Sequence, residues 1–255
     1  MNDIQLERPE HEIPINQVGV RNLSYPIRVL DKTNEFQNTI ADVTMLVDLP
    51  KQYRGTHMSR FIEILNKYKG EFAYKEVRPL LEELKVIFDA QCAHLSLSFP
   101  YFIEKAAPVS GAKSFLEYTA FFNSTLNDVF HFELGVKVPV SILCPCSKEI
   151  SDFGAHNQRA EITIVIEFSD FVWIEELVEI AESSASSPLY TLLKRTDEKF
   201  VTEHAYDNPC FVEDVVRRVA QKLLDDSRIK KFRVETISFE SIHNHNAFAL
   251  LEMTK

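Results

Sequence analysis

The order of apolar and polar residues predicts alternating strands and helices in the first half of the chain. Residues 41–49 alternate apolar and polar side chains, which is typical of a half-buried strand. The polar residues 31–34 lie between this strand and an earlier apolar run, so the two runs are expected to form a hairpin. A helix is predicted from the GTHMSRF segment (55–61) to Gly70. The other elements expected in this half are strands at 25–30, 93–103 and 114–122, a helix at 75–90 and a turn at 107–111.

The second half repeats this order of elements. Apolar residues alternate over 136–144, so Cys144 is expected at the carboxyl end of a strand. A helix is predicted over 209–224, with Asn208 as its cap and Pro209 in its first turn. The charged segment 192–206 is interpreted as a solvated loop. The remaining elements expected here are strands at 160–168, 231–239 and 246–252 and a helix at 171–181.

Both halves therefore read as strands, helices and strands again, which predicts two similar modules. Long alternating strands favour antiparallel sheets with helices on one face, an α+β arrangement. We expect a flexible arm at 1–13, a first module at 14–127 and a second module at 128–255 that carries most of the chemistry.

Composition narrows the class of protein. The chain has 255 residues, of which 45% are hydrophobic and 26% charged, as in ordinary globular proteins. A net charge of −10 argues against nonspecific nucleic-acid binding, although local cations could still receive a small anion. No apolar run approaches the roughly 20 residues of a membrane span, and the polar N-terminus is no signal peptide. The four cysteines are unevenly spaced, which favours a reducing cytoplasm over a disulfide framework.

The strongest chemical signal is the segment 143–159, LCPCSKEISDFGAHNQR. Cys144 and Cys146 are one residue apart, and His156 follows a short polar turn. Thiolates and imidazoles are suitable ligands for zinc or another first-row metal ion. If one thiol binds a metal, the other is available for chemistry. A purely structural zinc site is the alternative. By contrast, Cys92 and Cys210 are expected to be buried or incidental thiols.

Four further groups have both a functional and an ordinary explanation. Glu198 is either an oxygen ligand beside cations or part of a solvated loop. Glu213 would be favoured at a helix N-terminus by the helix dipole alone. The segment ESIHNHNA (240–247) contains Glu240, His243 and His245, which could be metal ligands, a proton relay or simply surface groups. His57, Ser59 and Arg60 begin a predicted helix, a position that favours anions but also fits ordinary helix initiation.

Several of these segments together resemble the prokaryotic type IB GTP cyclohydrolase I family. Order and spacing agree over nearly the whole chain, whereas P-loop, GxGxxG, nucleophile-elbow and HExxH motifs are absent. The segments that carry the resemblance are PINQVG (14–19), GTHMSRF (55–61), PVSG (108–111), LCPCSKEIS (143–151), GAHNQR (154–159), LLKR-DEK-VTE-AY (192–206), NP-FVED (208–214) and ESIHNHNA (240–247).

The resemblance implies two tandem tunnelling-fold modules that assemble as a homotetramer, a multimeric barrel with active sites at subunit interfaces. It implies conversion of GTP and water to 7,8-dihydroneopterin triphosphate and formate, for folate and for deazaguanine tRNA bases. A related cyclohydrolase that forms a cyclic-phosphate pterin, and a non-catalytic pterin- or purine-binding protein, are the alternatives.

The resemblance also assigns roles. Cys144, His156 and Glu198 are the expected ligands of one zinc, manganese or iron(II) ion. Cys146 is the expected catalytic thiol, and Glu213 the anchor for guanine. Further active-site groups are Glu240, His243 and His245. The triphosphate needs local cations, for which the candidates are Lys148, Arg159, Lys194, Arg195 and Lys199, with His57 and Arg60 from a neighbouring subunit.

Overall fold

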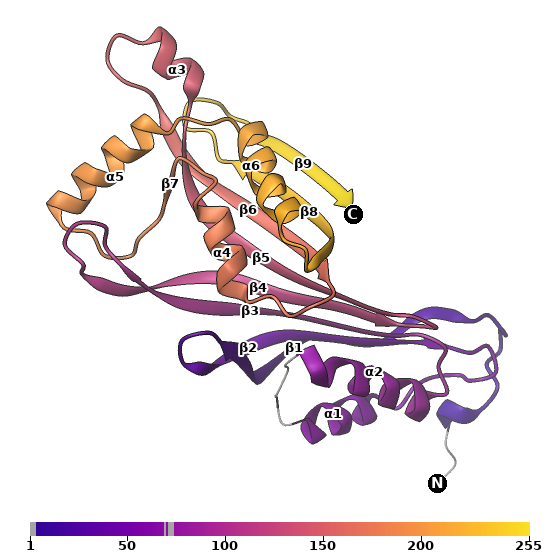
Figure 1. Cartoon of the computed structure of the whole chain (residues 1–255). Helices are drawn as coiled ribbons and strands as arrows, with labels where there is room; N and C mark the ends of the chain where they lie inside the picture. Colours follow the sequence, from indigo (N-terminus) through magenta and orange to yellow (C-terminus); the bar gives the residue numbers. More distant parts are fainter. Residues whose placement is uncertain (1–3, 69, 71–73) are drawn as a thin grey trace. The chain divides into compact units, whose positions relative to one another are not determined.

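The computed structural model describes residues 4–68, 70 and 74–255 (Figure 1). The chain divides into two compact units. One comprises Met1–Pro100 with Phe121–Glu133, and the other comprises Tyr101–Ala120 with Leu134–Lys255. Strands β3 (Ala93–Ala106), β4 (Lys113–Leu126) and β5 (Phe130–Leu143) contribute a part to each unit. The tandem modules at 14–127 and 128–255, and the flexibility of the 1–13 arm, stay predictions.

The first unit contains the predicted N-terminal hairpin. Strands β1 (Ile15–Asp31) and β2 (Glu35–Leu49) pair antiparallel, with Asp31 opposite Glu35. The Asp31 carboxylate accepts from the backbone N–H groups of Thr33 and Asn34, at 2.8 and 2.7 Å. These bonds stabilise the turn without help from other elements, which is why the sequence predicted it correctly.

Two helices of the first unit pack on this hairpin. Helices α1 (Met58–Lys67) and α2 (Tyr74–Phe88) contact each other, and they contact β1 and β2 respectively. The rings of Phe61 and Phe88 stack with centroids 4.2 Å apart. The predicted helices are therefore confirmed. A short 3-10 helix, Ile4–Leu6, precedes β1, and the Arg54 N–H donates to the carbonyls of Gln5 and Glu7.

The second unit is an antiparallel sheet covered by helices on one face. Its strands follow the order β3, β4, β5, β6 (Asn157–Phe168), β8 (Ile229–Ser238) and β9 (Ala247–Thr254), where β3 and β4 contribute their residues within Tyr101–Ala120. The two-residue β7 (Ser187–Pro188) pairs with β5. Helix α4 (Ile174–Glu182) contacts β6, and α6 (Val212–Asp225) contacts β8 and β9 (Figure 1). This confirms the α+β class with an antiparallel sheet and helices on one face. The barrel assembly stays a prediction.

Three local predictions in this unit were wrong. The segment 192–206 is not a loop but contains helix α5 (Arg195–Asp207), which was missed because only Asp197 and Ala205 of that helix are buried. The connection between the strands predicted at 136–144 and 160–168, expected as a loop that carries Cys146 and His156, contains the short helix α3 (Pro145–Ile150). Asn208 does not cap α6. Its amide donates to the His204 carbonyl at 2.7 Å and so closes α5, while α6 begins after Phe211, whose N–H donates to Asp214.

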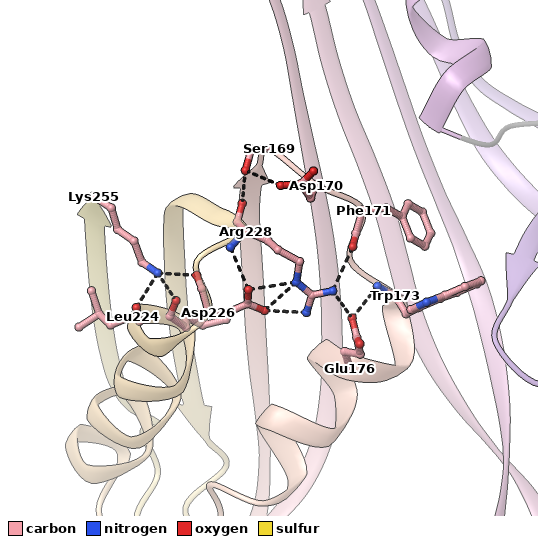
Figure 2. Close-up of polar contacts among 10 residues, drawn as sticks. Ser169, Asp170, Phe171, Trp173, Glu176, Leu224, Asp226, Arg228 and Lys255 are labelled. Atoms are coloured by element: carbon pink, nitrogen blue, oxygen red, sulfur yellow. Dashed lines mark hydrogen bonds and ion pairs between the residues drawn. The ribbon is translucent and has the colours of Figure 1, made fainter.

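A polar network fixes the end of the β6–β8 pair that lies farthest from the segment 143–159 (Figure 2). The Arg228 guanidinium donates to both carboxylate oxygens of Asp226, to Glu176 and to the Phe171 carbonyl, over 2.7–3.2 Å. The Lys255 ammonium donates to three carbonyls at the end of α6, those of Leu223, Leu224 and Asp226. Arg228 thereby links the segment before α4, at Phe171, to the segment after α6, at Asp226.

No helix in the described part of the chain combines the length and apolarity that a membrane crossing requires.

Candidate active site

The predicted soft ligands lie where β5 ends and β6 begins. Leu143 pairs with Asn157, and the Cys144 N–H donates to the His156 carbonyl at 3.1 Å. Cys144 is also the N-cap of α3, and its thiol accepts from the Ser147 N–H at 3.4 Å. The Ser147 hydroxyl accepts from the His156 N–H at 3.1 Å and donates to the Cys144 carbonyl. These hydrogen bonds hold the two ends of the segment together, with Cys144 directly after β5 and His156 directly before β6.

A polar network extends from His156 across the sheet. His156 Nδ1 lies 2.8 Å from Gln158 Oε1, and the Gln158 amide nitrogen donates to Glu240 Oε1 at 3.2 Å. The Ser238 hydroxyl also donates to Glu240, at 2.8 Å. Residues from β6 and from the end of β8 thus connect the predicted ligand His156 with the predicted active-site group Glu240. Sequence reasoning did not identify Gln158.

A pocket of about 210 Å³ opens beside this network. It collects three of the predicted residues: Cys144 just after β5, Glu213 in α6 and Glu240 just after β8. The other residues that line it are Ile142, Gln158, Cys210, Phe211, Val212, Ser238, Ala247 and Phe248. One carboxylate at the first turn of a helix and a second just after a strand therefore share a pocket with a thiol.

Cys210 was expected to be a buried or incidental thiol, and it is buried. Its sulfur lies 3.2 Å from the Ser186 hydroxyl, and burial raises the pKa of the thiol. Cys210 therefore lines the pocket as a neutral thiol. Cys92, in the first unit, is half-buried, and its sulfur lies 3.3 Å from His94 Nε2. Burial also raises the pKa of the Cys92 thiol, so the pair is a neutral contact.

The remaining predicted acid–base groups are solvent-exposed. Cys146 lies in α3 and is exposed. His243 and His245 lie in a bent segment before β9 rather than in an extended strand, so strand geometry does not set their directions. The structure nevertheless brings them together, because their rings stack with centroids 5.1 Å apart and an interplanar angle of 17°.

Glu198 lies in the first turn of α5 and is exposed. Its neighbour Asp197 is fully buried and anchors the helix to the PVSG turn. Asp197 accepts from the N–H groups of Val109, Ser110 and Lys194 at 2.8–2.9 Å, and from the Ser110 hydroxyl at 2.6 Å. Burial alone would raise the pKa of Asp197, but these hydrogen bonds together hold it well below its usual value. Asp197 therefore fixes where Glu198 is presented.

Within the described residues, no three His, Cys, Asp or Glu side chains are close enough together to hold a metal ion. The donor types nevertheless fit a divalent first-row ion. Cys144 and His156 flank the adjacent ends of β5 and β6, and the carboxylate that would complete a mixed sulfur, nitrogen and oxygen set comes from α5.

The candidate cations have different surroundings. Lys194 is the N-cap of α5 and Arg195 its first residue, and both side chains are exposed, as is Arg159 on β6. The Lys148 ammonium lies 4.2 Å from the centre of the Tyr206 ring and donates to the Tyr206 carbonyl. Lys199 pairs with Glu203 at 2.6 Å.

His57 and Arg60 belong to the first unit. His57 is the N-cap of α1 without a side-chain capping bond, and the Arg60 guanidinium lies 3.5 Å from the Ile87 carbonyl.

The fold of the chain is similar to that of solved structures from one class of protein, the urate oxidases. Two solved structures are similar to the chain in fold, a highly active mutant of urate oxidase from Bacillus sp. TB-90 and urate oxidase from Bacillus subtilis 168. Their TM-scores are 0.57 and 0.54, and identities are 11% and 9%. Each comparison covers 94% of this chain, and covers 100% and 98% of the urate oxidase chains respectively. At such low identity the likeness shows the fold alone, a tunnelling-like antiparallel arrangement.

Sequence comparisons identify the family. Residues 1–249 match the family described as type I GTP cyclohydrolase folE2. The chain is 56% identical to GTP cyclohydrolase FolE2 of Geobacter sulfurreducens, over all of this chain and 99% of that protein. It is 53% identical to the protein of that name from Thermosipho africanus, over 98% of this chain and 96% of the other. The chain belongs to the type I GTP cyclohydrolase FolE2 family.

Proposed function

We propose that this protein is a type IB GTP cyclohydrolase I that converts GTP and water to 7,8-dihydroneopterin triphosphate and formate. The product would enter folate biosynthesis and the synthesis of deazaguanine tRNA bases. One structural observation carries the proposal: Cys144, Glu213 and Glu240 line a single pocket. One of the two carboxylates can accept hydrogen bonds from a guanine ring, the other can exchange protons, and the Cys144 thiol can bind a metal ion beside them.

Glu213 is the proposed anchor for guanine. A carboxylate can accept from N1–H and from the 2-amino group together, and the first turn of α6 favours its negative charge. The pocket volume of about 210 Å³ is below the ~300–1,000 Å³ typical of ligand pockets. The pocket would therefore take the base and leave the triphosphate outside. There Arg159, Lys194 and Arg195 would receive it, with His57 and Arg60 of a neighbouring subunit.

Cys144, His156 and Glu198 are the residues that would hold a zinc, manganese or iron(II) ion. When bound, such an ion activates water near neutral pH for attack at C8 of guanine. Cys146, Glu240, His243 and His245 would exchange protons during ring opening and loss of formate. The stacked imidazoles and the exposed thiol are accessible enough for that role.

We also propose a homotetramer with active sites between subunits. Two observations support it. A single chain does not gather the proposed ligands into one group of three among the residues described. Strand β9 stands last in the strand order and exposes Phe248, Leu250 and Met253, and an uncovered apolar edge strand favours pairing with another chain. Light scattering of the purified protein tests this proposal, and a monomer that retains full activity would contradict it.

The decisive experiment for the function uses protein stripped of metal with a chelator and reloaded separately with zinc, manganese or iron(II). Formate release and the fluorescent neopterin obtained after oxidation and dephosphorylation are both measured with GTP. We expect both products to require metal. A cyclic-phosphate product would indicate the related cyclohydrolase instead. Folded, GTP-binding protein that releases no formate with any metal would indicate a binding protein, and unfolding on chelation would indicate a structural zinc.

The proposed triphosphate contacts are tested by replacing Arg159, Lys194 and Arg195 singly with alanine. Each replacement is expected to raise KM for GTP more than it lowers kcat, because these cations would bind ground state and transition state alike. Lys199→Ala is a matched control, since the Lys199 ammonium is paired with Glu203. Unchanged KM in all three variants would overturn the assignment.

A further inference from the structure

Gln158 lies between His156, a proposed metal ligand, and Glu240, a proposed active-site group. It is the second residue of β6, and His156 directly precedes that strand. Gln158 Oε1 lies 2.8 Å from His156 Nδ1, while Gln158 Nε2 lies 3.2 Å from Glu240 Oε1. The amide of one residue thus contacts an imidazole at one end and a carboxylate at the other.

The direction of the hydrogen bonds follows from the carboxylate. A glutamate carboxylate at neutral pH accepts hydrogen bonds and does not donate them, so the Gln158 atom that faces Glu240 must be the NH2 group. The amide oxygen therefore faces His156. A carbonyl oxygen also only accepts, so the proton of the neutral imidazole must lie on Nδ1. The Ser241 hydroxyl, 3.4 Å from Gln158 Oε1 and 3.2 Å from His156 Nδ1, fits the same arrangement by donating to that oxygen.

We propose that Gln158 is a positioning residue that keeps the proton of His156 on Nδ1, so that Nε2 is the nitrogen offered to a divalent metal ion. The inference rests on the proposed function for the metal, but the tautomer itself is a property of the metal-free chain. Glu240 would have an indirect part, because it fixes which way the Gln158 amide faces. Partners of this kind commonly hold ligating histidines in orientation, and their loss costs about 10–100-fold in metal affinity.

Three variants separate these contacts. Gln158→Glu keeps an oxygen acceptor for His156 Nδ1–H but places a second carboxylate against Glu240. Gln158→Met has a similar length and offers neither contact. Glu240→Gln removes the acceptor-only group, so the Gln158 amide can face either way. Gln221→Met is the matched control, because Gln221 is exposed on α6 and its amide donates to Asp225, away from the candidate site.

The first readout is the ¹⁵N NMR spectrum of metal-free protein with labelled histidine, at about pH 8, where a free imidazole is neutral. His156→Ala identifies the signals of His156. We expect a proton on Nδ1 in the wild type and in Gln158→Glu, and a mixture of tautomers in Gln158→Met and Glu240→Gln. A proton on Nε2 in the wild type, or an unchanged tautomer in Gln158→Met, would overturn the proposal.

The second readout is the dissociation constant for zinc, measured by competition with a chelating dye, with thermal unfolding as the control for folding. Gln158→Met is expected to weaken zinc binding by about 10–100-fold, with Gln158→Glu closer to the wild type. Equal affinities in all folded variants would contradict the positioning role. Absence of formate release from a wild type with the expected tautomer would refute the proposed function and leave the inference standing.

Discussion

The β6–β8 pair of the second unit has a polar network at each end, and the two networks are built differently. At one end, Arg228 bonds Asp226 and Glu176, so full charges are paired with each other (Figure 2). At the other end, an amide and hydroxyl groups connect His156 with Glu240, and nearby histidines and a thiol are exposed. Charge that is paired within the chain stabilises the fold. Charge and proton-binding groups that are not paired in this way are available to a ligand.

The pKa values at the Arg228 end express this difference. The hydrogen bond from Arg228 holds the pKa of Asp226 below its usual value, and the same contact raises the pKa of Arg228. A carboxyl group with a lowered pKa in the folded state contributes stability above its unfolded pKa of about 3.9 and loses it as the pH falls. The Arg228 end should therefore hold together at neutral pH and weaken in acid.

The largest effect is expected at the exposed thiol. Cys146→Ser should lower kcat by about 10²–10⁴-fold if Cys146 transfers a proton in the reaction, while the midpoint of thermal unfolding stays the same because the side chain is exposed. Formate release and calorimetry measure the two quantities. Cys92→Ser, which changes the half-buried thiol of the first unit, is the control and should keep kcat. Comparable activity in both variants would remove Cys146 from the reaction.

At the Arg228 end of the β6–β8 pair we expect the opposite result, a loss of stability without a loss of activity. Arg228→Ala leaves Asp226 and Glu176 without their shared cation, so it should lower the free energy of unfolding by about 2 kcal/mol, or about 5 °C in Tm. The kcat of the folded fraction should not change. Arg233→Ala removes an exposed pair with Glu235 and should cost less than about 1 kcal/mol. Equal losses in the two variants would show that the Arg228 network adds nothing beyond a surface ion pair.

Replacement of Asp197 tests whether the carboxylate that anchors α5 also positions Glu198, a proposed metal ligand. Asp197→Asn keeps the shape but weakens the bonds to Val109, Ser110 and Lys194, so Glu198 should be held less firmly and zinc affinity should fall by about tenfold. The wild type should lose stability as the pH falls below about 4, because the pKa of Asp197 is lowered in the folded state. Asp197→Asn should lose less stability than the wild type over that pH range. Urea unfolding from about pH 6 to pH 3 measures this, and identical pH profiles would contradict it.

The smallest effect is expected at the C-terminus. Lys255→Ala removes a cation that donates to three carbonyls at the end of α6, which should cost about 0.5 kcal/mol. Urea unfolding is sensitive enough to detect it. Zinc affinity and kcat should not change, because Lys255 lies at the Arg228 end of the unit. A change in zinc affinity would show that the two ends of the sheet are coupled.

Local rules were sufficient for most of the fold. The hairpin at Asp31–Asn34 is stabilised by its own side chain, and the strands of the second unit follow from period-two alternation. Helix α5 was not predicted, because the buried Asp197 anchors it to a turn more than 80 residues earlier in the chain, and a local pattern does not report such a contact. A helix with so few buried apolar residues has almost no periodic signal.

The sequence by itself determined the class of protein, the family resemblance and the chemical types of the candidate ligands, because residue identity and spacing carry that information. Only the tertiary structure decided that Cys144, Glu213 and Glu240 share a pocket, and that Gln158 lies between His156 and Glu240. These contacts join residues that are distant in sequence; Gln158 and Glu240, for example, are 82 positions apart. Strand pairing and the packing of α6 create them, and no local pattern in the sequence reports which distant side chains will meet.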